Sequence, residues 1–89
     1  MLKYSYAERV VSKIQQLTRD DSRVNGIVSK SFKAVLNDRC ELESVEWKFT
    51  NRTVIAYANC LMYFDGEESQ IPILTYDGFD DLLVLKKEE

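Results

Sequence analysis

Residues 44–64 read SVEWKFTNRTVIAYANCLMYF, and this stretch decides the fold class. Apolar and polar side chains alternate strictly over 44–49, which is the pattern of a strand with one face in a core. The polar residues 50–53 can turn, and 54–64 is a long run rich in β-branched and aromatic side chains. The stretch predicts two antiparallel strands, 44–49 and 54–64, joined by a short loop.

The chain after this stretch predicts a third strand. Asp65-Gly66 is a strong signal for a two-residue hairpin loop, because both loop positions need a positive φ. Residues 70–76 then form a strand, which Pro72 places at a sheet edge because proline lacks the ladder N–H. This loop pairs Tyr57 with Leu74 in the predicted register.

The predicted registers assign side chains to two sheet faces. A two-residue loop at Asn51-Arg52 pairs Trp47 with Ala56. One face is nearly all apolar, and we assign it to the core: Val45, Trp47, Phe49, Val54, Ala56, Ala58, Cys60, Met62, Ile71 and Ile73. The outer face is mixed: Glu46, Lys48, Ile55, Tyr57, Asn59, Leu61, Tyr63, Pro72, Leu74 and Tyr76.

The N-terminal part of the chain has helical periodicity instead. Apolar side chains recur every three to four residues over 5–19 and again over 24–37, which predicts two amphipathic helices. Ser5 is the expected N-cap of the first helix, with Glu8 completing a capping box.

The predicted fold is α+β, with two N-terminal helices packed on one face of a three- or four-stranded antiparallel β-meander. We expect one domain over 1–89, with a helical part at 1–40 and the sheet at 41–89. Residues 79–86 fit a short helix or a strand, and we favour a fourth strand. Residues 86–89 are expected to be a solvated tail.

The composition excludes most catalytic and metal chemistry. The 89 residues contain no His, which removes Ser-His-Asp and Cys-His catalysis and imidazole zinc sites. Cys40 and Cys60 are too few for an all-thiolate zinc site and form no CxxC motif. Phosphate-binding glycine loops are absent from the sequence. We expect no enzyme activity, no cofactor and no metal site.

The N-terminal sequence and the hydropathy pattern bear on localisation. There is no apolar run of signal-peptide or membrane-spanning length. We expect a cytoplasmic protein, in a host cytoplasm if a virus encodes it, with both cysteines as thiols.

The outer sheet face is the expected protein-binding surface. Aromatic side chains bury large areas and act as rigid anchors in interfaces, and monomers seldom leave such patches exposed. The alternative is that the C-terminal segment folds over this face and buries it. The residues assigned to this surface are Ile55, Tyr57, Leu61, Tyr63, Leu74 and Tyr76.

Charge is divided unevenly along the chain. The net charge of −3 comprises +4 over residues 1–40 and −7 over residues 41–89. Two acidic turns lack the spacing of an EF-hand loop, and we expect them to steer the molecule towards a basic partner, although solvated turns also favour Asp and Gly. Their acidic residues are Asp65, Glu67, Glu68, Asp77, Asp80 and Asp81.

These features favour a non-enzymatic binding module, acting as a stoichiometric inhibitor or adaptor. Inhibitors encoded by phages and mobile elements, anti-CRISPR proteins among them, are examples of this type, but the parallel is one of size and composition only. One alternative is a nucleic-acid-binding regulator that uses the basic helices through Arg9, Lys13, Lys30 and Lys33. Another is a structural homodimer whose sheet faces pack together.

Overall fold

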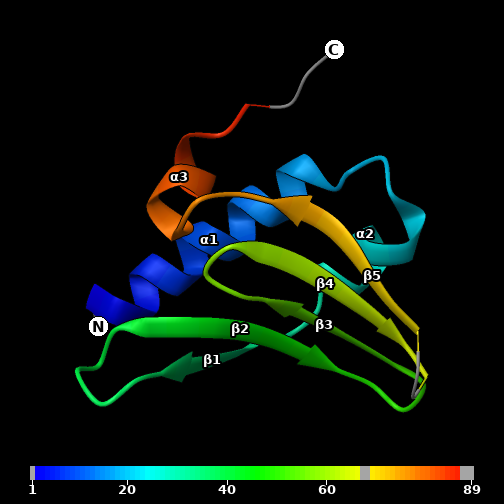
Figure 1. The fold of residues 1–89 in the computed structure, drawn as a ribbon, viewed down its shortest axis with the longest axis horizontal. Coiled ribbons are helices and arrows are strands. Elements are labelled where there is room, and N and C mark those ends of the chain that lie inside the picture. Colours follow the sequence, from blue (N-terminus) through cyan, green and yellow to red (C-terminus); the bar gives the residue numbers. More distant parts are fainter. Residues whose placement is uncertain (1, 67–68, 87–89) are drawn as a thin grey trace.

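The computed structural model describes residues 2–66 and 69–86. Within these residues, two helices are followed by five strands and a third helix, and Figure 1 shows how these elements are arranged. Their bounds are α1 (Leu2–Leu17), α2 (Ser22–Val28), β1 (Lys33–Leu36), β2 (Leu42–Lys48), β3 (Arg52–Ala56), β4 (Cys60–Asp65), β5 (Ser69–Thr75) and α3 (Phe79–Val84).

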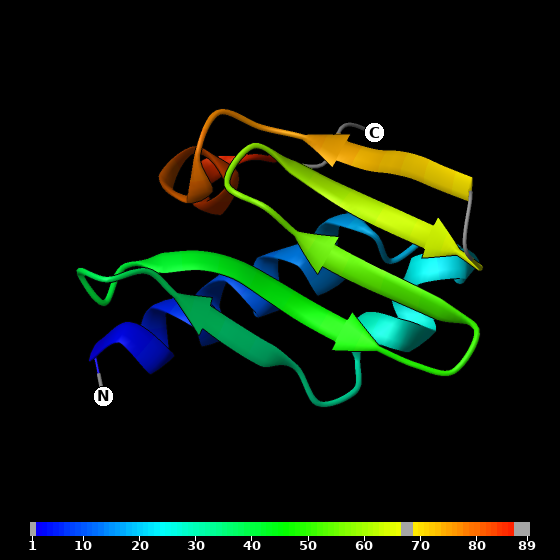
Figure 2. The same ribbon diagram turned by 60° about the horizontal axis from the view of Figure 1, so that its bottom comes forward.

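The strands form one antiparallel sheet in the order β1-β2-β3-β4-β5. All three helices lie on the same side of this sheet, as Figures 1 and 2 show, and α3 packs against α1. The α+β class is therefore confirmed, as is an antiparallel meander that follows two N-terminal helices in the chain. The sheet has five strands rather than three or four.

One extra strand comes from the segment predicted as the end of the second helix. The predicted helix over 24–37 is wrong in its second half, because α2 ends at Val28 and residues 33–36 form β1. The polar run from Ser29 to Ser31 interrupts the helical stripe, and Phe32 packs against Trp47 with ring centroids 6.4 Å apart. The apolar residues Val35 and Leu36 therefore belong to the edge strand β1, not to one face of a helix. The predicted cap at Ser5 is also wrong, since α1 begins at Leu2.

The other extra strand comes from dividing the predicted strand 54–64. A tight turn at residues 58–59 separates β3 from β4, closed by the Tyr57 N–H donating to the Cys60 carbonyl at 2.8 Å. This turn has no Gly or Pro, so only Asn59 marked it in the sequence.

Both predicted registers are wrong, but with different consequences. Trp47 pairs with Val54 rather than with Ala56, a shift of two residues that leaves every side chain of β2 and β3 on its predicted face. Leu74 pairs with Leu61 rather than with Tyr57, because β4 now lies between β3 and β5.

Residues 79–84 form a helix, so the preferred fourth strand at 79–86 is wrong. Gly78 has φ of +96° and is the N-cap of α3, which begins at Phe79. Asp80 and Asp81 lie in the first turn of α3, where negative charge is favoured by the helix dipole. Phe79 and Leu82 are buried. Of the predicted tail, Lys86 is exposed and 87–89 lie outside the described residues.

The core lies between the helices and the sheet. Trp47 is its largest fully buried side chain, at 1% exposure, and its indole Nε1 has no hydrogen-bond partner among the described residues. Predicted core residues Ala58, Cys60 and Met62 are not in this core, because the turn at 58–59 places them elsewhere. The largest fully buried side chains among the described residues are Val10, Ile14, Val24, Val28, Val45, Trp47, Val54, Leu61 and Leu82.

Candidate functional site

The six residues predicted to form one outer face do not lie together. Leu61, Tyr63 and Tyr76 are buried at 0%, 7% and 8% exposure, and half-buried Leu74 packs against the core. The predicted shared surface is therefore wrong for these four. The tight turn at 58–59 reverses the alternation: Leu61 pairs with Ala56 and so shares its core face.

The face of the sheet away from the helices carries a different apolar band. Across the middle of the sheet, Ile55 pairs with Met62, and Met62 pairs with Pro72. No described helix covers this side (Figures 1 and 2). We call this band the open sheet face and define it by Val35, Ile55, Tyr57, Met62, Phe64 and Pro72.

Burial on the open sheet face is graded. Ile55, Met62 and Phe64 are half-buried by neighbours on the sheet, while Tyr57 is 38% exposed at the rim. The charged residues Lys33 and Glu46 lie opposite each other in the register of β1 and β2, beside the band. Because α3 packs on α1, the described C-terminal residues do not fold over this face.

Sequence reasoning identified three members of the open sheet face, Ile55, Tyr57 and Pro72, and missed the others. Ile55 and Tyr57 precede the turn, so their predicted orientation was unaffected by it. Met62 and Phe64 follow the turn and were placed on the wrong face or left unassigned. Asn59 was the one signal within 54–64 that could have revealed the break.

The tyrosine hydroxyls have structural contacts. The Tyr76 hydroxyl donates to the Tyr57 carbonyl at 2.6 Å, and burial raises the pKa of Tyr76 above its ordinary value. The Tyr6 hydroxyl donates to Asp80 at 2.5 Å, and desolvation together with that carboxylate raises the pKa of Tyr6 to about 12. Both phenols therefore remain protonated donors at neutral pH.

The two predicted acidic turns lie at opposite ends of the sheet. Asp65 ends β4, whereas Asp77, Asp80 and Asp81 lie in and beside α3 at the other end (Figure 2). The turns therefore do not form one acidic surface. Glu67 and Glu68, the remaining predicted acidic residues, lie outside the described residues.

The end that carries Asp77 and Asp80 is hollowed. The hollow has a volume of about 660 Å³, and Glu41 and Cys40 from the β1–β2 loop also line it. Cys40 is exposed and has φ of +63°. No group of three or more Cys, Asp or Glu side chains within 2–66 and 69–86 is placed to hold a metal ion.

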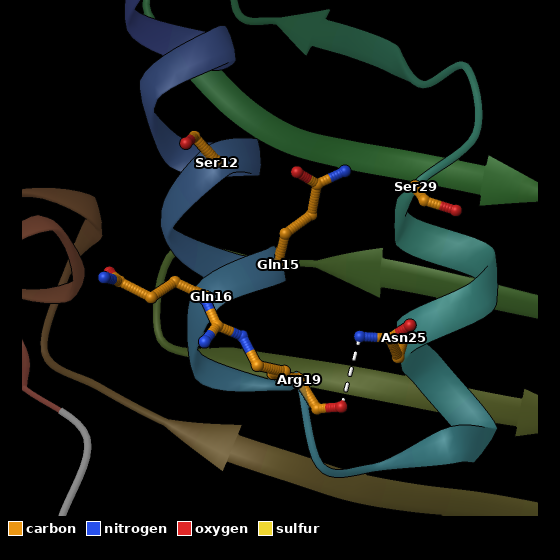
Figure 3. A pocket seen from close by; sticks show the side chains of 6 residues that line it. All are labelled: Ser12, Gln15, Gln16, Arg19, Asn25 and Ser29. Atoms are coloured by element: carbon orange, nitrogen blue, oxygen red, sulfur yellow. Dashed lines mark hydrogen bonds between the residues drawn. The ribbon is translucent and has the colours of Figure 1, made fainter.

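A polar cleft of about 500 Å³ separates α1 from α2 (Figure 3). Two of its amides hold the helices together: Gln15 Nε2 donates to the Val28 carbonyl at 2.7 Å, and Asn25 Nδ2 donates to the Arg19 carbonyl at 3.2 Å. We therefore assign these amides to helix packing. The cleft is lined by Ser12, Gln15, Gln16, Arg19, Asn25 and Ser29.

The basic residues predicted to bind nucleic acid are spread over several elements. Arg9 and Lys13 lie on α1, Lys30 follows α2, and Lys33 begins β1. The Lys13 ammonium donates to Gln16 at 3.4 Å. Among the described helices, none is long and apolar enough to cross a bilayer.

Comparisons with protein-family models, with curated proteins and with solved structures find no match to this chain.

Proposed function

We propose that this chain is a cytoplasmic, non-enzymatic protein-binding module, a stoichiometric inhibitor or adaptor that docks through its open sheet face. The observation that carries the proposal is an apolar band across the middle strands of a sheet whose helices all lie on the other side. An apolar centre with a polar rim is the usual anatomy of a protein interface. Lys33 and Glu46 supply such a rim here.

The occupant that we propose is a different protein with an apolar surface patch and basic surroundings. Asp77, Asp80 and Asp81 gather at one end of this molecule, together with Glu41. Such a cluster raises the rate of encounter with a basic surface without contributing much to final affinity. The open sheet face supplies the affinity, and the acidic end supplies the orientation.

The test compares charge insertions on the two sides of the sheet. Ile55→Glu and Tyr57→Glu place a negative charge in the open sheet face. Gln16→Glu adds the same charge at an exposed position on α1. A partner captured from native cells is purified, and its dissociation constant is measured for each variant by calorimetry. We expect a loss of affinity on the order of tenfold or more for the first two and none for the third.

Two further measurements keep the outcome clear. Circular dichroism establishes that the variants fold, and Tyr57→Glu, at an exposed position, is the one least able to disturb the core. Hydrogen exchange of the complex should show new protection in β3 and β4. Protection confined to the helices, or unchanged affinity in folded Tyr57→Glu, would refute the proposal. A dimer in light scattering that both sheet variants dissociate would assign the face to a second copy instead.

A further inference from the structure

Phe49 is an aromatic side chain left 42% exposed at the end of the sheet, on the side opposite to the open sheet face. Its N–H donates to the Arg52 carbonyl at 2.9 Å and closes the β2–β3 turn, so Phe49 and Arg52 lie opposite one another. Side chains alternate along a strand, so both share the face of Trp47 and Val54, which the helices cover further along.

The C-terminal end of α2 completes a small hollow around this pair. The hollow has a volume of about 200 Å³, and its remaining lining comes from Gly26, Ile27 and Lys30. Phe49 and Arg52 also line a second hollow of about 420 Å³ on the turn. Phe49 and Arg52 therefore border open space in both.

Of the residues that the structure describes, those lining the smaller hollow include two cations and no carboxylate. Within the described residues, neither Lys30 nor Arg52 takes part in an ion pair. The helix carbonyls nearby already have donors: the Gly26 carbonyl accepts from Ser29 Oγ, and the Ile27 carbonyl accepts from the Lys30 N–H, both at 3.0 Å.

The described carboxylate that competes for Arg52 is Asp65. It pairs with Arg52 across β3 and β4 and lines the larger hollow, not the smaller one. Without a salt bridge between them, the Arg52 guanidinium keeps donors for another acceptor.

We propose that Phe49, Lys30 and Arg52 form a binding site for a nucleotide unit of single-stranded nucleic acid. The base stacks on the Phe49 ring, and its phosphate lies between the two cations. An aromatic platform beside basic side chains is the arrangement by which proteins hold single strands without reading sequence. Arginine suits this role because its planar guanidinium donates to two phosphate oxygens at once. This site is separate from the open sheet face, because its side chains leave the sheet on the other side.

The test is fluorescence anisotropy with a labelled oligothymidylate at low ionic strength. We expect Phe49→Ala and Arg52→Glu each to weaken binding about tenfold, since loss of one stacked base costs about 1–3 kcal/mol and 1.4 kcal/mol is a factor of ten. Arg39→Glu is the matched control, because it makes the same charge change at an exposed position in the β1–β2 loop. It should bind as the unaltered protein does.

Each outcome decides the proposal. No binding by the unaltered protein, or equal weakening by Arg52→Glu and Arg39→Glu, would overturn it, the second result indicating only a response to net charge. Competition by free thymidine monophosphate would identify a mononucleotide as the ligand of the same site. Failure of the monophosphate to compete would support single-stranded nucleic acid as the ligand. The Tyr57→Glu variant should bind oligothymidylate normally, so the fate of the protein-binding proposal does not affect this result.

Discussion

At the scale of single residues, two tyrosines show that one residue type can have different roles. Tyr57 follows β3 and Tyr76 follows β5, yet Tyr57 exposes 38% of its surface and Tyr76 only 8%. Their one direct link is the hydrogen bond from the Tyr76 hydroxyl to the Tyr57 carbonyl. Tyr76 is therefore a structural residue, and Tyr57 is available to a partner.

This difference predicts a dependence of stability on alkaline pH. The folded pKa of Tyr76 is raised by burial, so the unfolded chain loses this proton first as pH rises. The stabilisation is complete below pH of about 10, the ordinary tyrosine pKa, and is lost as pH rises beyond it.

We expect Tyr76→Phe to be less stable than the unaltered protein by about 1 kcal/mol at neutral pH, through loss of the hydrogen bond. Its free energy of unfolding should then decline less steeply in alkali. Urea unfolding at a series of pH values measures both effects, with Tyr57→Phe as the control. Parallel declines in the Tyr76→Phe and unaltered proteins would contradict the explanation.

At the scale of elements, Gly26 and Gly78 occupy two different backbone environments. Gly78 has φ of +96° immediately before α3, whereas Gly26 lies inside α2. A Cβ atom added at either position would meet no heavy atom within 4 Å. Any difference between alanine substitutions at the two sites therefore reports the backbone and not packing.

We expect Gly26→Ala to stabilise the protein by about 0.5–1 kcal/mol, because alanine loses less conformational freedom on entering a helix. Gly78→Ala should destabilise it by about 1–3 kcal/mol, because alanine is strained at this φ. Chemical denaturation of the two variants gives both values. Changes of the same sign would show that neighbouring contacts, not φ, govern these positions.

At the scale of the whole molecule, the end of the sheet beside α3 is rich in acidic side chains. The acidic residues of α3 and the β1–β2 loop lie at one end of the sheet, and Lys48 and Arg52 lie at the other (Figure 2). The acidic end attracts a basic ligand over a range that salt shortens.

For the captured protein partner, we expect Asp77→Asn with Asp81→Asn to slow association several-fold at low ionic strength and to leave dissociation nearly unchanged. Both residues are exposed, so the fold should not change. Stopped-flow or surface-plasmon kinetics at low and high salt separate the two rates. Faster dissociation with unchanged association would place these carboxylates inside the contact, not outside it.

The sequence alone was enough for the features that depend on local periodicity. The helical spacing near the N-terminus, the alternation over 44–49 and the hairpin signals led to the α+β class and to the core positions Val45, Trp47, Val54 and Ala56. The shift of two residues in the β2–β3 register did no harm there, since side chains repeat every second residue.

Only the tertiary structure decided which side chains of β4 face the core, and with them the candidate sites. The turn at Ala58-Asn59 reversed the alternation, which buried Leu61 and Tyr63 and turned Met62 outward. The meeting of Lys30 from the end of α2 with the β2–β3 turn was likewise beyond local patterns. The physical reason is that the position of a turn decides which side chains of the next strand face the core. Ala58-Asn59 contains no Gly or Pro, so the sequence hardly indicates where this turn lies.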